Sequence, residues 1–174
     1  MKSKFLNVVL LALPFLIVGC GESKTVIQAA VTKTEETRQI TKNSTSLTVY
    51  KSATCGCCQK WIDHVEETGI KVNIEHPDDL SALKDRLNIG KQYRSCHTGV
   101  TENGYVFEGH IPARYIQQFL NNPPADAIGL SVPGMPVGSP GMEFKEKFMP
   151  YQIHLLKKDG TSELFALVDD PSQQ

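Results

Sequence analysis

Residues 47–68 read LTVYKSATCGCCQKWIDHVEET. The first four residues alternate and favour extended structure, which predicts a strand. Residues 58–68 carry apolar side chains at helical spacing, which predicts a helix. Between these two elements lie Cys55, Cys57 and Cys58. The stretch therefore predicts a strand, a short turn and a helix, with three thiols gathered where the helix begins.

The elements that follow alternate in a regular way. We expect a strand at 70–75, a helix near 80–87, a hairpin across 100–107 with an Asn-Gly turn, and a helix that begins after Pro112. The order β-α-β-α-β-β-α, with cysteines on the first strand-to-helix turn, is that of a thioredoxin-like domain. The N-terminus of a helix carries partial positive charge and free N–H groups, so this turn is expected to favour thiolate anions.

Two further elements are expected after the last helix. Residues 129–150 are dense in Pro and Gly, which disfavours a helix or a central strand, so we predict a long ordered loop or lid. Residues 151–168 predict a closing β-hairpin with an Asp-Gly turn. The predicted α/β fold is therefore a thioredoxin-like domain over 47–168, with a C-terminal Pro/Gly-rich loop and closing hairpin, followed by a tail at 169–174.

The first twenty residues have the features of an export signal. Two lysines precede an apolar run that is too short to span a bilayer comfortably, and the run ends in Ile17-Val18-Gly19-Cys20. This ending resembles the lipobox of bacterial lipoproteins, which implies a signal peptide at 1–19, lipidation of Cys20 and a lipidated tether over 20–46. Gly21 stands where an aspartate would retain the protein in the inner membrane, so we expect a periplasmic protein anchored in the outer membrane. An ordinary signal peptide and a short membrane anchor are the alternatives.

The composition excludes some classes of function. The formal net charge is −1 at pH 7, so there is no basic excess for binding nucleic acid and no strong acidity for binding a cationic partner. The periplasm is oxidising, and unprotected thiols tend to form disulfides there. The four thiols of the domain would therefore need a metal or a reductant in order to persist. The composition carries no signal of oligomeric state.

The fourth of these thiols lies in the doublet Cys96-His97. Thiolates are soft ligands that favour Cu(I), zinc and iron–sulfur clusters. A structural zinc usually takes two closely spaced pairs of ligands, whereas this chain has one Cys-x-x-Cys pair, Cys55 and Cys58. Thiolates that bridge several Cu(I) ions would suit Cys57, because it is adjacent to Cys58 and projects differently. The pattern favours copper, with zinc as the alternative.

The spacing of Cys55 and Cys58 is also that of a thiol–disulfide redox pair, with Cys55 as nucleophile and Cys58 as resolving thiol. Cys57 argues against a dedicated oxidoreductase, because a third adjacent thiol invites other disulfides. Three interpretations stay open: a metal-binding protein that exchanges electrons with copper, a thiol–disulfide oxidoreductase, and a plain metal buffer.

Four further side chains are candidates for the same site. His97 adjoins the fourth thiol and would complete the site at its rim. His110 precedes the last predicted helix of the domain and is a candidate to orient the site or to bind the metal, with a structural hydrogen bond as the alternative. Met135 and Met142 lie in the Pro/Gly segment, and thioethers bind Cu(I) well, although packing over the site is the alternative. His64, on the first predicted helix, is expected to be solvated or to belong to a second site.

Several separated motifs point to one family. They are CGCC at 55–58, SCHT at 95–98, EGHIPA at 108–113 and VPGMPVGSPGME at 132–143. In this order they resemble the CopG-type periplasmic copper-handling proteins, a domain family long described only as of unknown function, and the similarity runs over 47–167. The resemblance implies a thioredoxin-like fold, a Cu(I)-thiolate cluster on the matching cysteines, and a role in copper resistance through copper redox interconversion or transfer. It also implies copper ions and other periplasmic copper-handling proteins as partners.

Overall fold

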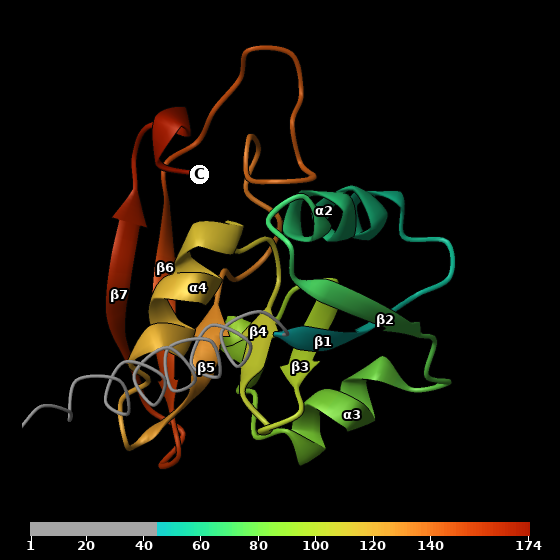
Figure 1. Cartoon of the computed structure of the whole chain (residues 1–174), viewed down its shortest axis with the longest axis vertical. Helices are drawn as coiled ribbons and strands as arrows, with labels where there is room; N and C mark the ends of the chain where they lie inside the picture. Colours follow the sequence, from blue (N-terminus) through green and yellow to red (C-terminus); the bar gives the residue numbers. More distant parts are fainter. Residues whose placement is uncertain (1–44) are drawn as a thin grey trace, which may run out of the picture. The chain divides into compact units, whose positions relative to one another are not determined.

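The computed structural model describes residues 45–174. The expected signal peptide, the lipidation site Cys20 and nearly all of the tether lie outside the described residues. The described part is α/β, as predicted, and its strands form one mixed sheet in the order β2-β1-β3-β4-β5-β6-β7 (Figure 1). The strands are β1 (Ser46–Lys51), β2 (Lys71–Glu75), β3 (His97–Thr101), β4 (Val106–Glu108), β5 (Ala127–Ser131), β6 (Tyr151–Lys157) and β7 (Ser162–Val168). The α-helices are α2 (Gly56–Glu66), α3 (Leu80–Arg86) and α4 (Ala113–Asn121), and two short 3-10 helices are η1 (Lys91–Tyr93) and η2 (Pro171–Gln173).

The pairing of β1 with β3 decides where the cysteines meet. These two strands are antiparallel, and Lys51 at the end of β1 is paired with His97 at the start of β3. The turn that carries the first three cysteines follows β1, and Cys96 precedes β3, so this register places both segments at the same end of the sheet. Strand β1 is also parallel to β2, with α2 as the crossover between them.

Apolar side chains cover both faces of the sheet. On one face, α2 and α4 contribute to a large buried cluster that includes Trp61, Phe107 and Phe119. On the other face a smaller cluster contains Ile89 and Val106, because neighbouring residues of β4 point to opposite sides of the sheet. Figure 1 shows α2 and α3 on opposite sides of β1 and β3. None of the helices within 45–174 has both the length and the apolar character that crossing a bilayer requires.

Helix α2 begins two residues earlier than predicted. Cys55 is its N-cap residue, with extended backbone (φ −76°, ψ 97°), and the helix starts at Gly56 rather than at Cys58. Cys57 and Cys58 therefore both lie in the first turn, where backbone N–H groups have no partner within the helix. The predicted start was wrong because apolar periodicity begins only at Cys58, and neither a cysteine N-cap nor a following glycine is a recognised start signal.

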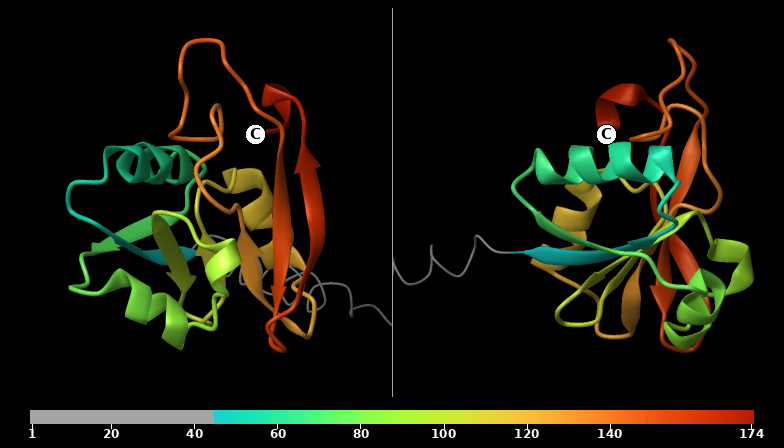
Figure 2. Two further views of the ribbon diagram at one scale, coloured as in Figure 1. Left: turned by 180° about the vertical axis from the view of Figure 1, so that it is seen from behind. Right: turned by 90° about the vertical axis from the view of Figure 1, so that its right-hand side faces the viewer.

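The prediction that 129–150 contains no central strand is wrong for its first residues. Ala127–Ser131 form β5, which lies between β4 and β6. Gly129 (φ 153°) is required there, because a Cβ atom on it would lie only 1.8 Å from the Val106 carbonyl oxygen of β4. This glycine marks a close approach of two strands rather than a loop. The irregular segment is therefore 132–150, which leaves β5 and rises beside α2 before it returns to β6 (Figure 2).

The end of the chain is attached to this irregular segment. Strands β6 and β7 are antiparallel, with Gly160 (φ 83°) in the turn that joins them. Residues 169–174, expected as a tail, contain η2, and Gln174 Nε2 donates a hydrogen bond of 2.7 Å to the Gly138 carbonyl oxygen. The last residue of the chain thereby contacts the segment that passes over α2.

Candidate metal centre

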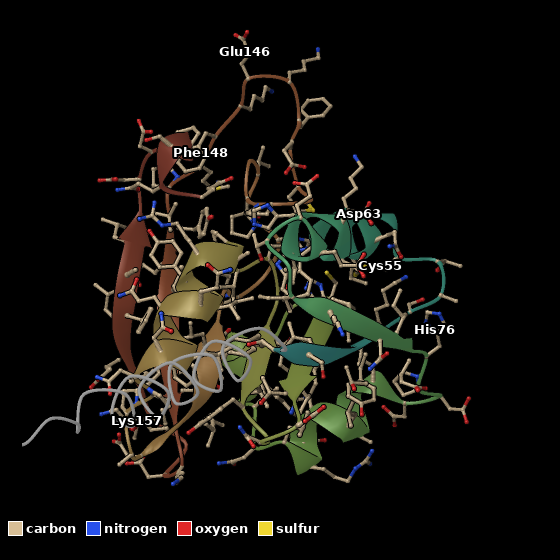
Figure 3. The ribbon with its side chains drawn as sticks, in the orientation of Figure 1. Cys55, Asp63, His76, Glu146, Phe148 and Lys157 are labelled. Atoms are coloured by element: carbon tan, nitrogen blue, oxygen red, sulfur yellow. A yellow bond between two sulfur atoms is a disulfide. The ribbon has the colours of Figure 1, made fainter. Side chains whose placement is uncertain are left out.

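The fold brings the four predicted thiols together. Cys55, Cys57 and Cys58 lie at the N-terminus of α2, Cys96 lies just before β3, and the four sulfur atoms are all within 4.8 Å of one another. A disulfide joins Cys55 to Cys58. Cys57 Sγ is 3.5 Å from Cys55 Sγ, and Cys96 Sγ is 3.4 Å from Cys58 Sγ. Figure 3 shows Cys55 beside the first turn of α2.

The two free thiols of this group are Cys57 and Cys96, and both are half-buried. Burial, together with the neighbouring charge of Cys57, raises the pKa of the Cys96 thiol to about 11. Cys96 is therefore a neutral thiol at pH 7 in the metal-free protein. A thiol must lose its proton to become a metal ligand, so metal binding at Cys96 would release a proton.

His110 has the geometry of a metal ligand. Its Nδ1 is 2.8 Å from the Pro140 carbonyl oxygen, which can only accept a hydrogen bond, so Nδ1 carries the proton. The lone pair is then on Nε2, which lies 3.1 Å from Cys96 Sγ. Burial lowers the pKa of His110, so its ring is neutral at pH 7. A carbonyl that fixes the tautomer from the far side is typical of histidines that bind metal.

His97 is fully buried beside the same thiol. Its Nδ1 is 3.4 Å from Cys96 Sγ, and its Nε2 has no hydrogen-bond partner within 45–174. The ring packs against Trp61, with 4.3 Å between ring centroids, and against the edge of His110 at 5.0 Å. Burial lowers the pKa of His97 well below its usual value. A buried nitrogen without a partner costs about 1–3 kcal/mol. The nitrogen that contacts Cys96 is the other one, Nδ1.

Cys96 links two groups of ligands. It lies within 4.8 Å of the three thiols of α2, and also within 4.8 Å of one ring nitrogen each from His97 and His110. The sequence predicts His97 at the rim of the site and His110 in an orienting or a structural role. The structure places both rings against Cys96.

Helix α2 also holds the segment that carries His110. Trp61 Nε1 donates a hydrogen bond of 2.8 Å to the Ile111 carbonyl oxygen, and His64 Nε2 accepts one of 3.0 Å from the Ala113 backbone N–H. The prediction that His64 is solvated or belongs to a second site is wrong. It satisfies a free N–H at the start of α4, whose N-cap residue is a proline without a capping side chain.

This role of His64 predicts a pH effect on stability. Burial lowers the pKa of His64 in the folded protein, although the charges of Glu67 and Glu143 oppose the shift. The unfolded chain therefore binds a proton more readily, so the contribution of His64 is complete above pH 6.5 and is lost as the pH falls below it. His64→Gln keeps an acceptor that does not titrate. Between pH 7 and 5, we expect the free energy of unfolding of the metal-free wild type to fall by up to about 1 kcal/mol more than that of the variant. The effect is small because the half-buried ring is partly screened. Thermal unfolding at each pH measures it. Equal pH slopes would contradict this role.

The irregular segment 132–150 packs directly on the thiol turn. A Cβ atom on Gly141 (φ 83°) would lie 2.6 Å from the Cys57 carbonyl oxygen, so only glycine allows this contact. Met142 follows this glycine and is half-buried, whereas the Met135 side chain is 51% exposed. The outermost turn of the segment carries Glu146 (Figure 3). The segment thus covers one side of the centre, and copper binding by its methionines stays a prediction.

Comparisons with known proteins agree with this geometry. The family model described as "Protein of unknown function, DUF411" matches residues 93–142. Two solved structures titled "Copper resistance protein copG", Form 2 and Form 1, are each 42% identical and cover 72% of this chain and 98% of their own, with TM-scores of 0.68 and 0.67. No curated protein sequence matches the chain. The matched structures carry the name of a copper resistance protein, and this chain has a cysteine and histidine group that could bind a metal.

Proposed function

Because the chain belongs to the CopG-type family of copper-handling proteins, we propose that it binds Cu(I) as a thiolate-bridged cluster on Cys55, Cys57, Cys58 and Cys96. The observation that carries this proposal is the approach of all four sulfur atoms to within 4.8 Å of one another. A metal–thiolate bond is about 2.3 Å long in zinc sites, so two sulfurs on one ion lie at most ~4.6 Å apart. Once the Cys55–Cys58 disulfide is reduced and the thiols lose their protons, thiolates this close would repel one another, and shared Cu(I) ions would relieve that repulsion.

The two imidazoles extend this set of ligands. His110 Nε2 and His97 Nδ1 are neutral nitrogen donors that face Cys96, and imidazole suits copper as well as zinc. Zinc stays the alternative metal. The thioether of Met142 or Met135 is a further candidate ligand from the segment that covers the thiol turn.

A thioredoxin-like scaffold is part of the proposal. It is supported by the sheet order β2-β1-β3-β4, by the parallel pairing of β1 with β2 and by the antiparallel pairing of β1 with β3 and β3 with β4. It is also supported by the place of the Cys-x-x-Cys turn between β1 and α2. In such a scaffold the turn holds the redox pair Cys55 and Cys58. Together with Cys57 and Cys96, this pair would form the copper site.

The disulfide supports a redox role for the same site. When two Cu(II) ions each gain one electron, the thiols of Cys55 and Cys58 lose two electrons, release two protons and form the S–S bond. The products are two Cu(I) ions and a disulfide at the position where the structure has one. Copper resistance would then follow from interconversion of the two oxidation states or from transfer of Cu(I) to another periplasmic protein. We further propose export and lipid anchoring through Cys20, on the sequence of the first twenty residues.

Cys57 separates copper binding from plain disulfide exchange. It is outside the Cys55–Cys58 disulfide, yet its sulfur is 3.5 Å from that of Cys55. Cys57→Ser is therefore expected to lower the number of Cu(I) ions bound per reduced chain while leaving reduction of insulin disulfides within about twofold of wild type. Metal analysis after an anaerobic titration and an insulin reduction assay measure the two properties, and Cys20→Ser is the matched control. Loss of disulfide reduction with full retention of copper would favour the thiol–disulfide oxidoreductase instead.

A further inference from the structure

A buried ion pair contacts the backbone next to Cys96 of the metal centre. Lys84 of α3 and Glu108 of β4 meet with 2.5 Å between Nζ and Oε1, and their side chains are 4% and 0% exposed. Taking two charges out of water costs several kcal/mol each, and a buried pair is often no more stabilising than apolar residues of similar volume. Burial of this pair therefore calls for a reason other than the stability of the core.

The pair holds the residue that precedes Cys96. Glu108 Oε1 accepts a hydrogen bond of 2.6 Å from the Ser95 backbone N–H, and Lys84 Nζ donates one of 2.6 Å to the Ser95 carbonyl oxygen. Ser95 precedes β3, so neither of these backbone groups has a strand partner. The ion pair supplies both missing partners, which a buried backbone requires.

The same carboxylate also holds the other side of the Cys96-His97 doublet. Glu108 Oε2 accepts a hydrogen bond of 2.5 Å from Thr98 Oγ1. Ser95 and Thr98 are the two residues that flank the doublet in the sequence. The buried carboxylate of Glu108 thus holds both ends of the segment 95–98, which carries the Cys96 thiol and the His97 imidazole.

We propose that Lys84 and Glu108 are positioning residues that hold Cys96 and His97 in place for the metal centre. Neither side chain is a ligand; each acts through the backbone of Ser95 or the hydroxyl of Thr98. The proposal rests on the copper site proposed above, because Cys96 is the one thiol within 45–174 that joins the sulfur group to the imidazoles. A small displacement of this segment would disturb both groups at once.

The test replaces the pair without leaving a charge unpaired. Lys84→Met with Glu108→Leu keeps the buried volume, and such apolar replacements commonly retain the fold. With the Cys55–Cys58 disulfide intact, Cys57 and Cys96 are the thiols of the site that iodoacetamide can label. Peptide mapping gives both labelling rates from one sample. We expect the ratio of the Cys96 rate to the Cys57 rate to rise about tenfold, equivalent to ~1.4 kcal/mol of local ordering.

The labelling ratio distinguishes positioning from general loosening. Lys157→Met with Glu163→Gln, which removes a partly exposed ion pair of 2.7 Å, is the matched control and should leave the ratio unchanged. Equal acceleration of both thiols, or an unchanged ratio, would overturn the proposal. If the first double variant does not fold, Lys84→Met with Glu108→Gln removes both charges and keeps the shape of the glutamate. It is expected to shift the ratio in the same direction.

A second measurement connects the pair to copper. In the reduced protein the same double variant should bind Cu(I) about 10–100-fold more weakly, as expected when a group that supports a metal ligand is lost. Wild-type affinity together with an unchanged labelling ratio would overturn the proposal. A third outcome is a wild type that binds no copper and a double variant in which the labelling ratio is still shifted. It would refute the copper site and leave the positioning of Cys96 supported. The two failures are therefore distinguishable.

Discussion

Cys96→Ser is expected to weaken Cu(I) binding to the reduced protein by at least about 100-fold and to lower the number of copper ions bound. Cys96 is the member shared by the thiol group and the imidazole group, with its sulfur 3.4 Å from Cys58 Sγ and 3.1 Å from His110 Nε2. A serine hydroxyl is a hard donor that stays protonated at neutral pH, so it cannot replace a bridging thiolate. Loss of an outer group that only supports a ligand typically costs 10–100-fold in affinity, and loss of the ligand itself should cost at least the upper value.

The fold should tolerate this change. Serine is close to cysteine in size and Cys96 is half-buried, so the free energy of unfolding is expected to stay within about 1 kcal/mol of wild type. Competition with a chromogenic Cu(I) chelator gives the affinity, and thermal unfolding of the metal-free protein gives the stability. Cys20→Ser, the same substitution outside the group of four, should bind copper as the wild type does. Equal copper binding by Cys96→Ser and Cys20→Ser would remove Cys96 from the site.

The second large effect concerns the Cys55–Cys58 disulfide. Sulfur atoms joined in a disulfide are not thiolate donors, so the oxidised protein retains only Cys57 and Cys96 of the four. Each of these two lies against a different sulfur of the disulfide. We therefore expect the oxidised protein to bind Cu(I) at least about 100-fold more weakly than the reduced protein, because two of the four soft ligands are missing.

The comparison can be made on one preparation, titrated anaerobically before and after reduction and removal of the reductant. Cys55→Ser with Cys58→Ser is the control, because it cannot form the disulfide and should bind copper weakly under both conditions. Copper binding that is independent of the oxidation state of wild type would show that Cys55 and Cys58 are not ligands. It would also separate the redox pair from the metal site.

The two cysteine motifs could be recognised from the sequence because their signals are local. Three cysteines at a strand-to-helix turn need no knowledge of the fold, and Cys96-His97 is recognisable from its composition. What joins the two motifs is the antiparallel register that pairs Lys51 with His97. Pairing between distant segments depends on the whole sheet, so spacing alone could not establish it.

Other features were missed because their signals lie in tertiary contacts. The Pro and Gly density predicts a loop at Gly129, although the backbone of β4 requires this glycine within a strand. His64 has ordinary helical surroundings in the sequence, and only the packing of α2 on α4 reveals its bond to the Ala113 N–H. Lys84 lies in the last turn of α3, where lysines are usually solvated, and its partner Glu108 is 24 residues away. No local pattern marks such a pair as buried.

The most direct test of the proposed copper cluster is an anaerobic Cu(I) titration of the fully reduced wild-type protein, with metal analysis of the product. A cluster bridged by four thiolates requires saturation at more than one copper per chain. Saturation at one copper or none, with zinc bound normally in its place, would contradict the cluster and favour the zinc-binding alternative.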